Sequence, residues 1–238
     1  MEKYFDDIVK NLSQMIKFDS SQKPAEEGKP FGAENARCLD FFLSLASFLG
    51  FEVKNYDNYV GEVRYGAGED FAVLAHLDVV PAGSGWTHEP FGGEVDRENG
   101  KIWGRGAMDD KGPALITLYA MKALKDAGFK PKKNIKLIVG CNEESGWACI
   151  AHYNKVAKMP ETGISPDADF PVIYAEKGIV HLTFEFDCEN PSFTSLSGGK
   201  SANMVCDYCQ ASAPENKALL EQLGLEYAEG NVISRGKS

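Results

Sequence analysis

Four short clusters of histidine and carboxylate side chains are the residues of this sequence with the clearest chemistry. They are His76-Leu77-Asp78, Asp109-Asp110, Glu143-Glu144 and Asp167. Carboxylates gathered in a partly dry cleft repel one another unless a cation neutralises them or some of them hold protons. Mixed imidazole and carboxylate ligands suit zinc, manganese or a similar ion. The residue types therefore point to a metal site, provided that the fold brings the clusters together.

The elements that must position these clusters can be read from hydrophobic periodicity. Apolar stripes at three- and four-residue steps predict helices over residues 4–16 and 33–50. A third helix begins at Pro113 and ends at Gly128, in keeping with the usual start and stop signals. The irregular stretch 81–112 between them is rich in Gly and Pro, which is typical of a functional loop.

Buried strands alternate with these helices. Strands are predicted over residues 71–78, 134–144 and 172–176, with a helix over 145–158 between the last two. This alternation indicates an α/β domain with a largely parallel sheet flanked by helices. The carboxyl ends of parallel strands meet at one edge of the sheet, so we expect all four clusters to converge there.

The pattern changes after residue 178. Apolar and polar residues alternate over 179–187, which predicts a half-exposed antiparallel strand. We therefore expect a catalytic, metal-binding domain over 1–178 and the beginning of an α+β lid domain over 179–238. The 60 residues of this second part are too few for an independent core, so the lid is expected to be incomplete.

Composition excludes several classes of function. The 238 residues include 25 Lys and Arg against 35 Asp and Glu, a formal net charge of -10, which argues against nucleic acid and anionic membranes as partners. No apolar run approaches the roughly 18 residues of a spanning helix, and the charged N-terminus is unlike a signal peptide. We expect a cytoplasmic protein with reduced cysteines.

Each cluster taken alone has an ordinary structural explanation. A His-x-Asp at a strand end is usually a hydrogen-bonded pair, and adjacent acidic residues usually lie on a solvated surface. His88, His152 and His181 have no acidic cluster at a strand end beside them and are interpreted as structural or surface residues. The metal-site hypothesis depends on the joint occurrence of the four clusters.

Four motifs together resemble the PepV-type dipeptidases, a branch of the co-catalytic di-metal superfamily that also contains aminoacylases and carboxypeptidases. The motifs are HLDVVP (76–81), WGRGAMDDKGP (103–113), NEESG (142–146) and PDADFPV (166–172). They occur in the family's order across essentially the whole chain. The resemblance implies a dipeptidase that hydrolyses short peptides with two divalent ions, zinc or else manganese or cobalt.

The resemblance also implies a role for each residue. His76 and Asp167 would bind one ion, Asp109 would bridge both ions, and Glu144 would bind the second. Glu143 would be the general base that acts on a water activated by the two ions. Asp78 would accept the ring N–H of His76, as carboxylates behind metal-ligating histidines do. A cis peptide bond between Asp109 and Asp110 is implied as well.

Two departures from the family pattern leave alternatives open. One further ligand His and most of the lid are absent, because relatives are about twice as long; this chain is expected to be an N-terminal portion. Asn203 matches a lid residue that contacts substrate, or is simply a turn residue. The alternatives are an N-acyl amino acid hydrolase or carboxypeptidase, a non-catalytic fragment that binds one ion, and a redox role for Cys206 and Cys209.

Overall fold

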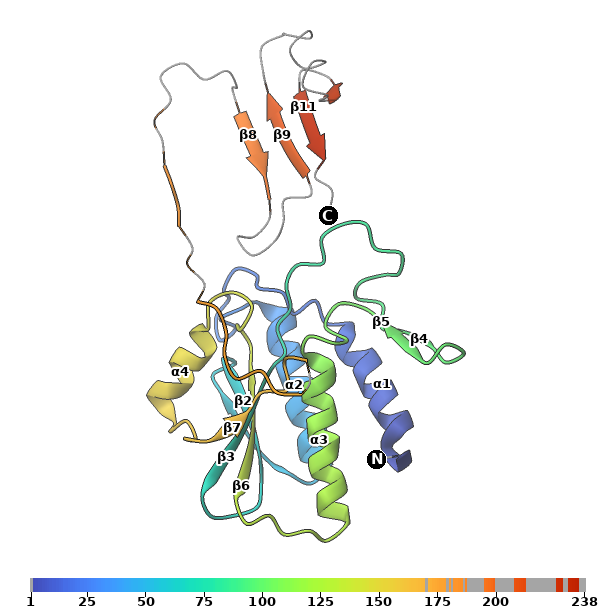
Figure 1. Cartoon of the computed structure of the whole chain (residues 1–238), viewed down its shortest axis with the longest axis vertical. Coiled ribbons are helices and arrows are strands. Elements are labelled where there is room, and N and C mark those ends of the chain that lie inside the picture. The colour runs from blue at the N-terminus through green and yellow to red at the C-terminus, as the bar shows by residue number, and fades with distance from the viewer. Residues whose placement is uncertain are drawn as a thin grey trace. The chain divides into compact units, whose positions relative to one another are not determined.

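A mixed sheet forms the centre of the structure, a computed structural model (Figure 1). Its strands lie in the order β1 (Glu52–Tyr56), β2 (Val60–Tyr65), β6 (Asn134–Gly140), β3 (Asp70–His76) and β7 (Gly163–Ile164). The structure describes residues 2–169, 171–178, 180, 182–185, 187, 195–199, 208–212, 226–228 and 231–235. The chain divides into two compact units, residues 1–173 and residues 174–238.

The direction of the strands changes in the middle of the sheet. β3 runs parallel to both β6 and β7, whereas β6 is antiparallel to β2 and β2 is antiparallel to β1. The register of β3 and β6 places His76 opposite Gly140, so these two strands end at the same level. The half of the sheet that carries the acidic clusters is therefore parallel, and the predicted α/β class is confirmed.

Helices cover both faces of the sheet. They are η1 (Glu2–Tyr4, a 3-10 turn), α1 (Phe5–Ile16), α2 (Ala33–Phe48), α3 (Lys111–Asp126) and α4 (Ala148–Val156). Gly61 and Glu62 of β2 lie on opposite faces of the sheet, because successive side chains along a strand point to opposite sides. A Cβ at Gly61 would meet Leu39 of α2 at 2.7 Å, whereas the Glu62 carboxylate accepts a hydrogen bond from Tyr153 of α4. The glycine thus permits α2 to approach the sheet closely.

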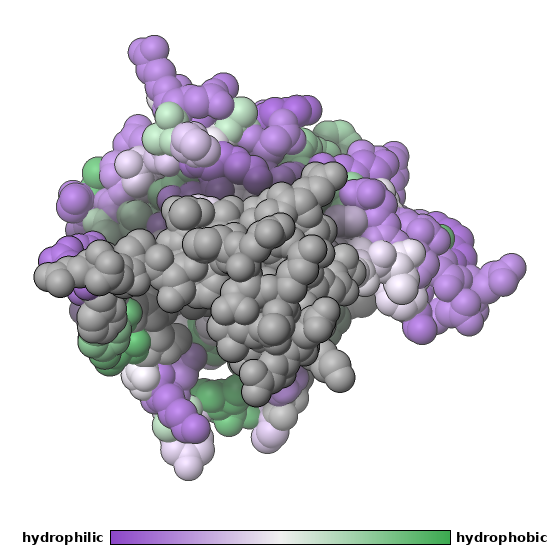
Figure 2. Space-filling view, turned by 90° about the horizontal axis from the view of Figure 1, so that it is seen from above, coloured by the Kyte–Doolittle hydropathy of each residue, from purple (hydrophilic) through white to green (hydrophobic). Residues whose placement is uncertain are grey.

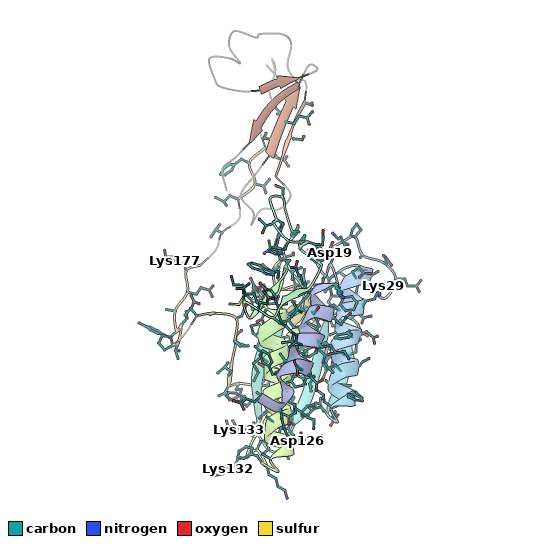
Figure 3. The ribbon with its side chains drawn as sticks, turned by 90° about the vertical axis from the view of Figure 1, so that its right-hand side faces the viewer. Asp19, Lys29, Asp126, Lys132, Lys133 and Lys177 are labelled. Atoms are coloured by element: carbon teal, nitrogen blue, oxygen red, sulfur yellow. The ribbon has the colours of Figure 1, made fainter. Side chains whose placement is uncertain are left out.

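Helices α1 and α3 pack along each other on the α2 side. At the end far from the predicted site, the Tyr4 hydroxyl donates to the Asp126 carboxylate at 2.5 Å, and Lys3 and Lys122 form ion pairs with the same carboxylate. Figure 3 shows Asp126 at one end of this helical layer and Asp19 at the other. These contacts tie the beginning of the chain to the end of α3.

Two hairpins add to the elements expected from the sequence. β1 and β2 pair antiparallel, and β4 (Glu94–Asp96) pairs with β5 (Lys101–Trp103) inside the stretch that was expected to be irregular. Both pairs are held by hydrogen bonds between neighbouring segments, which periodicity within one segment does not reveal.

Two predicted strands are wrong. Residues 172–176 form no strand, and neither do the described residues of 179–187. The alternating residues Val180 and Leu182 are 77% and 70% exposed. Alternation shows that a segment is compatible with a sheet, but a strand exists only where a neighbour completes its hydrogen bonds. No described strand pairs with either segment.

The second unit, described by itself, contains a four-stranded antiparallel sheet. Its order is β10 (Glu226–Ala228), β11 (Asn231–Arg235), β9 (Tyr208–Ser212) and β8 (Ser195–Gly198). Asn203, His181 and Cys206 lie outside the described residues. The predicted division at 178/179 remains an expectation.

Hydrophilic residues dominate the described surface that Figure 2 shows, in line with the high charge of the chain. Among the described helices, none has the length and apolar character needed to cross a bilayer.

Candidate metal centre

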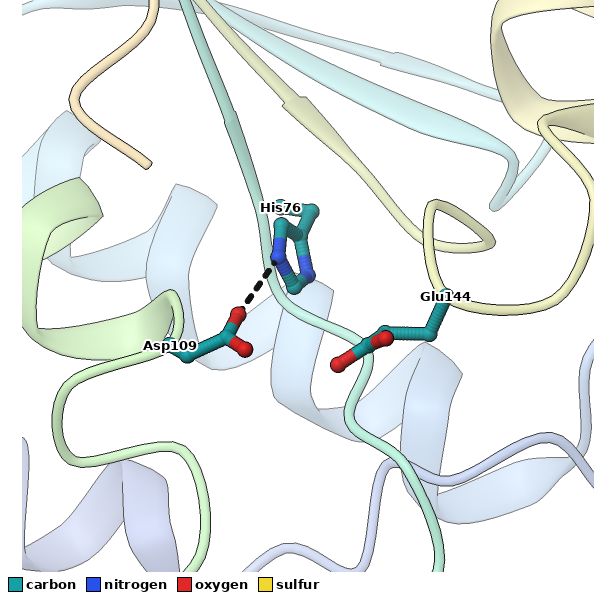
Figure 4. A group of neighbouring side chains, drawn as sticks. All are labelled: His76, Asp109 and Glu144. Carbon is teal, nitrogen blue, oxygen red and sulfur yellow. Dashed lines mark ion pairs between the residues drawn. The ribbon is translucent and has the colours of Figure 1, made fainter. Parts of the chain in front are cut away.

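The predicted site residues follow the carboxyl ends of the three parallel strands. His76 is the last residue of β3, Glu143 and Glu144 follow β6, and Asp167 follows β7. Asp109 lies just before α3, which packs on β3 and β6. Figure 4 shows Asp109 and Glu144 reaching toward His76 from two sides. The expected convergence at one edge of the sheet is therefore observed.

The imidazole of His76 is the centre of the cluster. Its Nε2 atom lies 3.0 Å from Asp109 Oδ1, 3.5 Å from Asp167 Oδ2 and 3.9 Å from Glu143 Oε2. The ring is 2% exposed, whereas the side chain of Asp109 is 64% exposed. A buried nitrogen thus faces carboxylates that reach out to solvent, so an ion from solution has a path to it.

Asp78 makes a different contact from the one that the resemblance implies. The His76 Nδ1 atom lies 2.9 Å from the backbone carbonyl oxygen of Asp78, while the carboxylate Oδ1 is farther away, at 3.5 Å. The carboxylate instead accepts the backbone N–H groups of Glu143 and Glu144, at 3.0 and 3.1 Å. Donation of a ring N–H from Nδ1 to the carbonyl leaves Nε2 as the nitrogen that can bind a metal.

Asp110 belongs to one of the four predicted clusters but had no predicted role of its own, and the structure buries it. One carboxylate oxygen accepts the backbone N–H of His76 at 3.1 Å, and the other has no hydrogen-bond partner among the described residues. Burial raises the pKa of Asp110 to about 7. The Asp109-Asp110 peptide bond is cis, as the resemblance implies. The only sequence feature that pointed to Asp110 was its position next to Asp109 in a pair of acidic residues.

The cluster shifts the pKa values of its members in opposite directions. Burial would lower the pKa of His76, but the carboxylates of Asp109, Asp167 and Asp78 outweigh it and raise that pKa well above its usual range. The His76 imidazole in turn lowers the pKa of Asp109. Burial raises the pKa of Glu143, and burial together with the charge of Asp109 raises that of Glu144 to about 7.

The residues present fit a divalent ion. Two groups have one ligand atom from each member within 4.8 Å of one another: His76, Asp109 and Glu144, and His76, Asp110 and Asp167. The buried Nε2 of His76 has no hydrogen-bond partner among the described residues although three carboxylates surround it. A cation would relieve the mutual repulsion of these carboxylates, and imidazole with carboxylate is a donor set that zinc and manganese accept.

A buried lysine next to the cluster links the start of α3 to the segment at the end of α1. The ammonium of Lys111, next to Asp110, donates to the carbonyl oxygens of Met15 and Phe18 at 3.1 and 2.8 Å. Met15 lies in the last turn of α1 and Phe18 just after it, where the helix dipole favours a positive charge. Burial lowers the pKa of Lys111. The residue thereby fixes the start of α3 against α1.

Two of the remaining histidines have structural contacts away from His76. The His88 ring stacks on Trp103 at 4.4 Å between centroids, and its Nδ1 lies 2.9 Å from Glu94. His152 stacks on Tyr59 and forms a pair with Asp57. The structure places neither of them in the cluster, which agrees with their interpretation as structural or surface residues.

Comparisons with known proteins connect this arrangement to a family. Residues 72–217 match the model of "Peptidase family M20/M25/M40". The chain is 46% identical over 184 residues to "Beta-Ala-Xaa dipeptidase" of Lactobacillus delbrueckii subsp. lactis, covering 76% of this chain and 39% of that protein. It is 38% identical over 227 residues to YtjP of Bacillus subtilis (strain 168), covering 90% of this chain and 48% of YtjP. The chain thus spans less than half the length of either relative.

A solved structure has a related fold. Human carnosine dipeptidase 1 superposes with a TM-score of 0.55 at 24% sequence identity, over 65% of this chain and 36% of that one. At this identity the likeness concerns the fold, and it supports the assignment of the sheet and its helices.

Proposed function

Because the chain belongs to the M20/M25/M40 peptidase family, we propose that it forms the metal-binding part of a dipeptidase that uses two divalent ions. The observation that carries the proposal is the convergence of His76, Asp109, Glu144 and Asp167 at the carboxyl edge of the parallel strands. The high identity to a protein named Beta-Ala-Xaa dipeptidase favours this activity over others of the family.

Four residues of the cluster, one histidine and three acids, have a proposed role as ligand. His76 and Asp167 would hold one ion, Glu144 would hold the other, and Asp109 would be shared by both. Asp109 suits the bridging role because its carboxylate is the most exposed of the group and lies next to both His76 and Glu144. Two bound divalent ions lower the pKa of water and polarise a peptide carbonyl.

Glu143 is proposed as the general base. Its carboxylate lies at the edge of the cluster, 3.9 Å from His76 Nε2, and is partly exposed. It accepts a proton from the attacking water and delivers that proton to the leaving amine. Burial raises the pKa of Glu143, which makes its carboxylate a better proton acceptor than an ordinary surface glutamate.

The proposed substrates are short peptides, in particular dipeptides with an N-terminal β-alanine. N-acyl amino acids and longer peptides are the substrates expected for the alternative activities, an N-acyl amino acid hydrolase and a carboxypeptidase. A third alternative is a non-catalytic fragment that binds one ion through His76, Asp109 and Asp167.

The test uses the full-length native protein, stripped with a chelator and reloaded with zinc, manganese or cobalt. We expect two ions per chain and hydrolysis of β-alanyl dipeptides, with much slower cleavage of tripeptides and N-acetyl amino acids. Preference for an acylated amino acid or a longer peptide would assign one of the alternative activities. One bound ion without turnover would indicate a metal-binding protein that is not a peptidase.

A further inference from the structure

We propose that Asn142 is a positioning residue that holds the loop of Glu143 and Glu144 in the geometry that the metal centre needs. The proposal rests on the proposed function, because it concerns the ligand role of Glu144 and the base role of Glu143. In the contacts that the described residues make, the Asn142 side chain does not touch the cluster around His76. Its effect would act through the backbone of the loop.

Asn142 closes the loop with two hydrogen bonds, one to its backbone and one to its side chain. Its carbonyl oxygen accepts the N–H of Trp147 at 2.8 Å, and its side-chain Oδ1 accepts the N–H of Ala148 at 3.0 Å. Ala148 is the first residue of α4, where backbone N–H groups lack partners within the helix. One residue thus joins the end of β6 to the beginning of α4 across the two glutamates.

The loop needs such a closure because of its conformation. Trp147 has φ of +63° and ψ of 20°, the left-handed region that side chains other than glycine seldom adopt. The hydrogen bond from its N–H to Asn142 holds the chain in this reversal. That bond uses the backbone of residue 142, so the part of the closure that depends on the Asn142 side chain is its bond to the N–H of Ala148, the residue next to Trp147. Loss of this second bond would let the end of the loop relax, and the glutamates lie between the two ends of the same loop.

Asn142 and Asp78 hold the loop from different sides. The Asp78 carboxylate holds the backbone N–H groups of Glu143 and Glu144. Asn142 holds the far end of the loop, through its backbone carbonyl at Trp147 and its side chain at Ala148. The Asn142 amide also lies 3.4 Å from Gln22 Oε1, which links the loop to the segment after α1. Asn142 is 2% exposed, so water cannot readily replace these contacts.

The side chain of Asn142 suits this place because it is neutral. An amide oxygen accepts the Ala148 N–H without adding a further negative charge to the loop that carries Glu143 and Glu144 and is held by the Asp78 carboxylate. A contact that only stabilised the fold would affect unfolding of the whole protein. A positioning contact changes the affinity for metal and the rate of turnover in protein that remains folded.

The test compares variants of the full-length native protein by calorimetric titration with manganese alone and by dipeptide turnover. Asn142→Ala is expected to bind manganese about 10- to 100-fold more weakly, the range found when groups behind metal ligands are removed. Its kcat should fall with little change in KM, since the Asn142 side chain is buried and contacts only Ala148 and Gln22. Asn142→Asp keeps an oxygen that can accept the Ala148 N–H but adds a negative charge, so it should recover only part of the lost affinity.

A matched control comes from the other end of the same strand. Asn134 is the first residue of β6 and donates its amide to Asp70 at 2.7 Å, away from the loop. Asn134→Ala should change the unfolding temperature without changing metal affinity or kcat. If Asn142→Ala does not fold, Asn142→Gln serves instead, since it keeps the amide but displaces the oxygen by one methylene; about a tenfold loss of affinity is expected.

Two results would overturn the inference in distinguishable ways. Wild-type affinity and kcat in folded Asn142→Ala, or in Asn142→Gln where that variant replaces it, would leave the proposed function intact and assign Asn142 to stability alone. A wild-type protein that binds no manganese and cleaves no dipeptide would refute the proposed function, and the positioning role with it.

Discussion

The Asp78 carboxylate accepts the backbone N–H of Glu143 at 3.0 Å, so a residue at the end of β3 holds the candidate base at the end of β6. The second oxygen of the same carboxylate holds the neighbouring N–H of Glu144. Hydrogen bonds to an ionised acceptor are the strong ones, and this acceptor is 2% exposed. Asp78 therefore acts on the glutamates more directly than on the imidazole.

Asp78→Asn is predicted to weaken metal binding and turnover together. An amide retains one acceptor oxygen, but its NH₂ group would face a backbone N–H, so one of the two hydrogen bonds is lost. We expect a loss of about 10- to 100-fold in metal affinity, measured by titration of the full-length native protein. Asp6→Asn is the control, because Asp6 is 81% exposed and lies on α1. Equal affinity in the two variants would contradict the role given to Asp78.

Glu143→Gln is predicted to abolish turnover and to leave the metal in place. The amide is close to the carboxylate in shape but cannot accept the proton, and general bases contribute about 10²- to 10⁴-fold to rates. The measurement is kcat together with the metal content of the purified variant. Glu161→Gln is the control, since the Glu161 side chain is 81% exposed. Loss of metal with the activity would make Glu143 a ligand instead.

The metal-free protein is predicted to lose stability as the pH rises from about 4.5 to about 7. The pKa of Glu144 is raised by burial from 4.5 to about 7, and that of Asp110 from 3.8 to about 7. A carboxyl with a raised folded pKa contributes stability below its unfolded pKa, and that contribution is lost as pH rises through the folded value. The raised pKa of His76 acts in the same direction above pH 6.5.

Thermal unfolding across this pH window, with and without manganese, checks the prediction. Bound metal should remove most of the dependence, because the ion replaces the protons on the carboxylates. Glu144→Gln should flatten the curve of the metal-free protein. A metal-free protein whose unfolding temperature rises from pH 5 to pH 7 would contradict the assignment.

Lys111→Met is predicted to destabilise the protein by about 1–3 kcal/mol, because it removes two hydrogen bonds that the buried ammonium donates to carbonyl oxygens, and each such bond contributes about 0.5–1.5 kcal/mol. The two carbonyls are those of Met15 and Phe18. Methionine retains much of the volume of the side chain, so the loss reports the hydrogen bonds more than a cavity. Chemical denaturation measures the change, and exposed Lys130→Met is the control. A difference below about 0.5 kcal/mol between the two variants would exclude the supporting role, since surface substitutions have effects of that size.

Much of the site could be predicted because its residues follow strands with clear apolar patterns. The run that ends at His76 and the run that precedes Glu143 are buried strands in sequence and in structure, and they lie side by side in parallel. Residues at the ends of such strands share one edge, whatever their separation along the chain. Asp110 was part of a predicted cluster but had no predicted role of its own, because adjacent acids resemble a solvated surface, whereas the structure buries it completely.

The sequence by itself determined the class of chemistry, the residues that carry it and the strands that end beside them, because residue type and periodicity are local properties. Only the tertiary structure decided which atoms meet: that the Asp78 carboxylate holds the glutamate loop, that Asn142 closes it, and that residues 179–187 form no described strand. Such contacts depend on register and on packing between segments far apart in the chain, and no single segment encodes them.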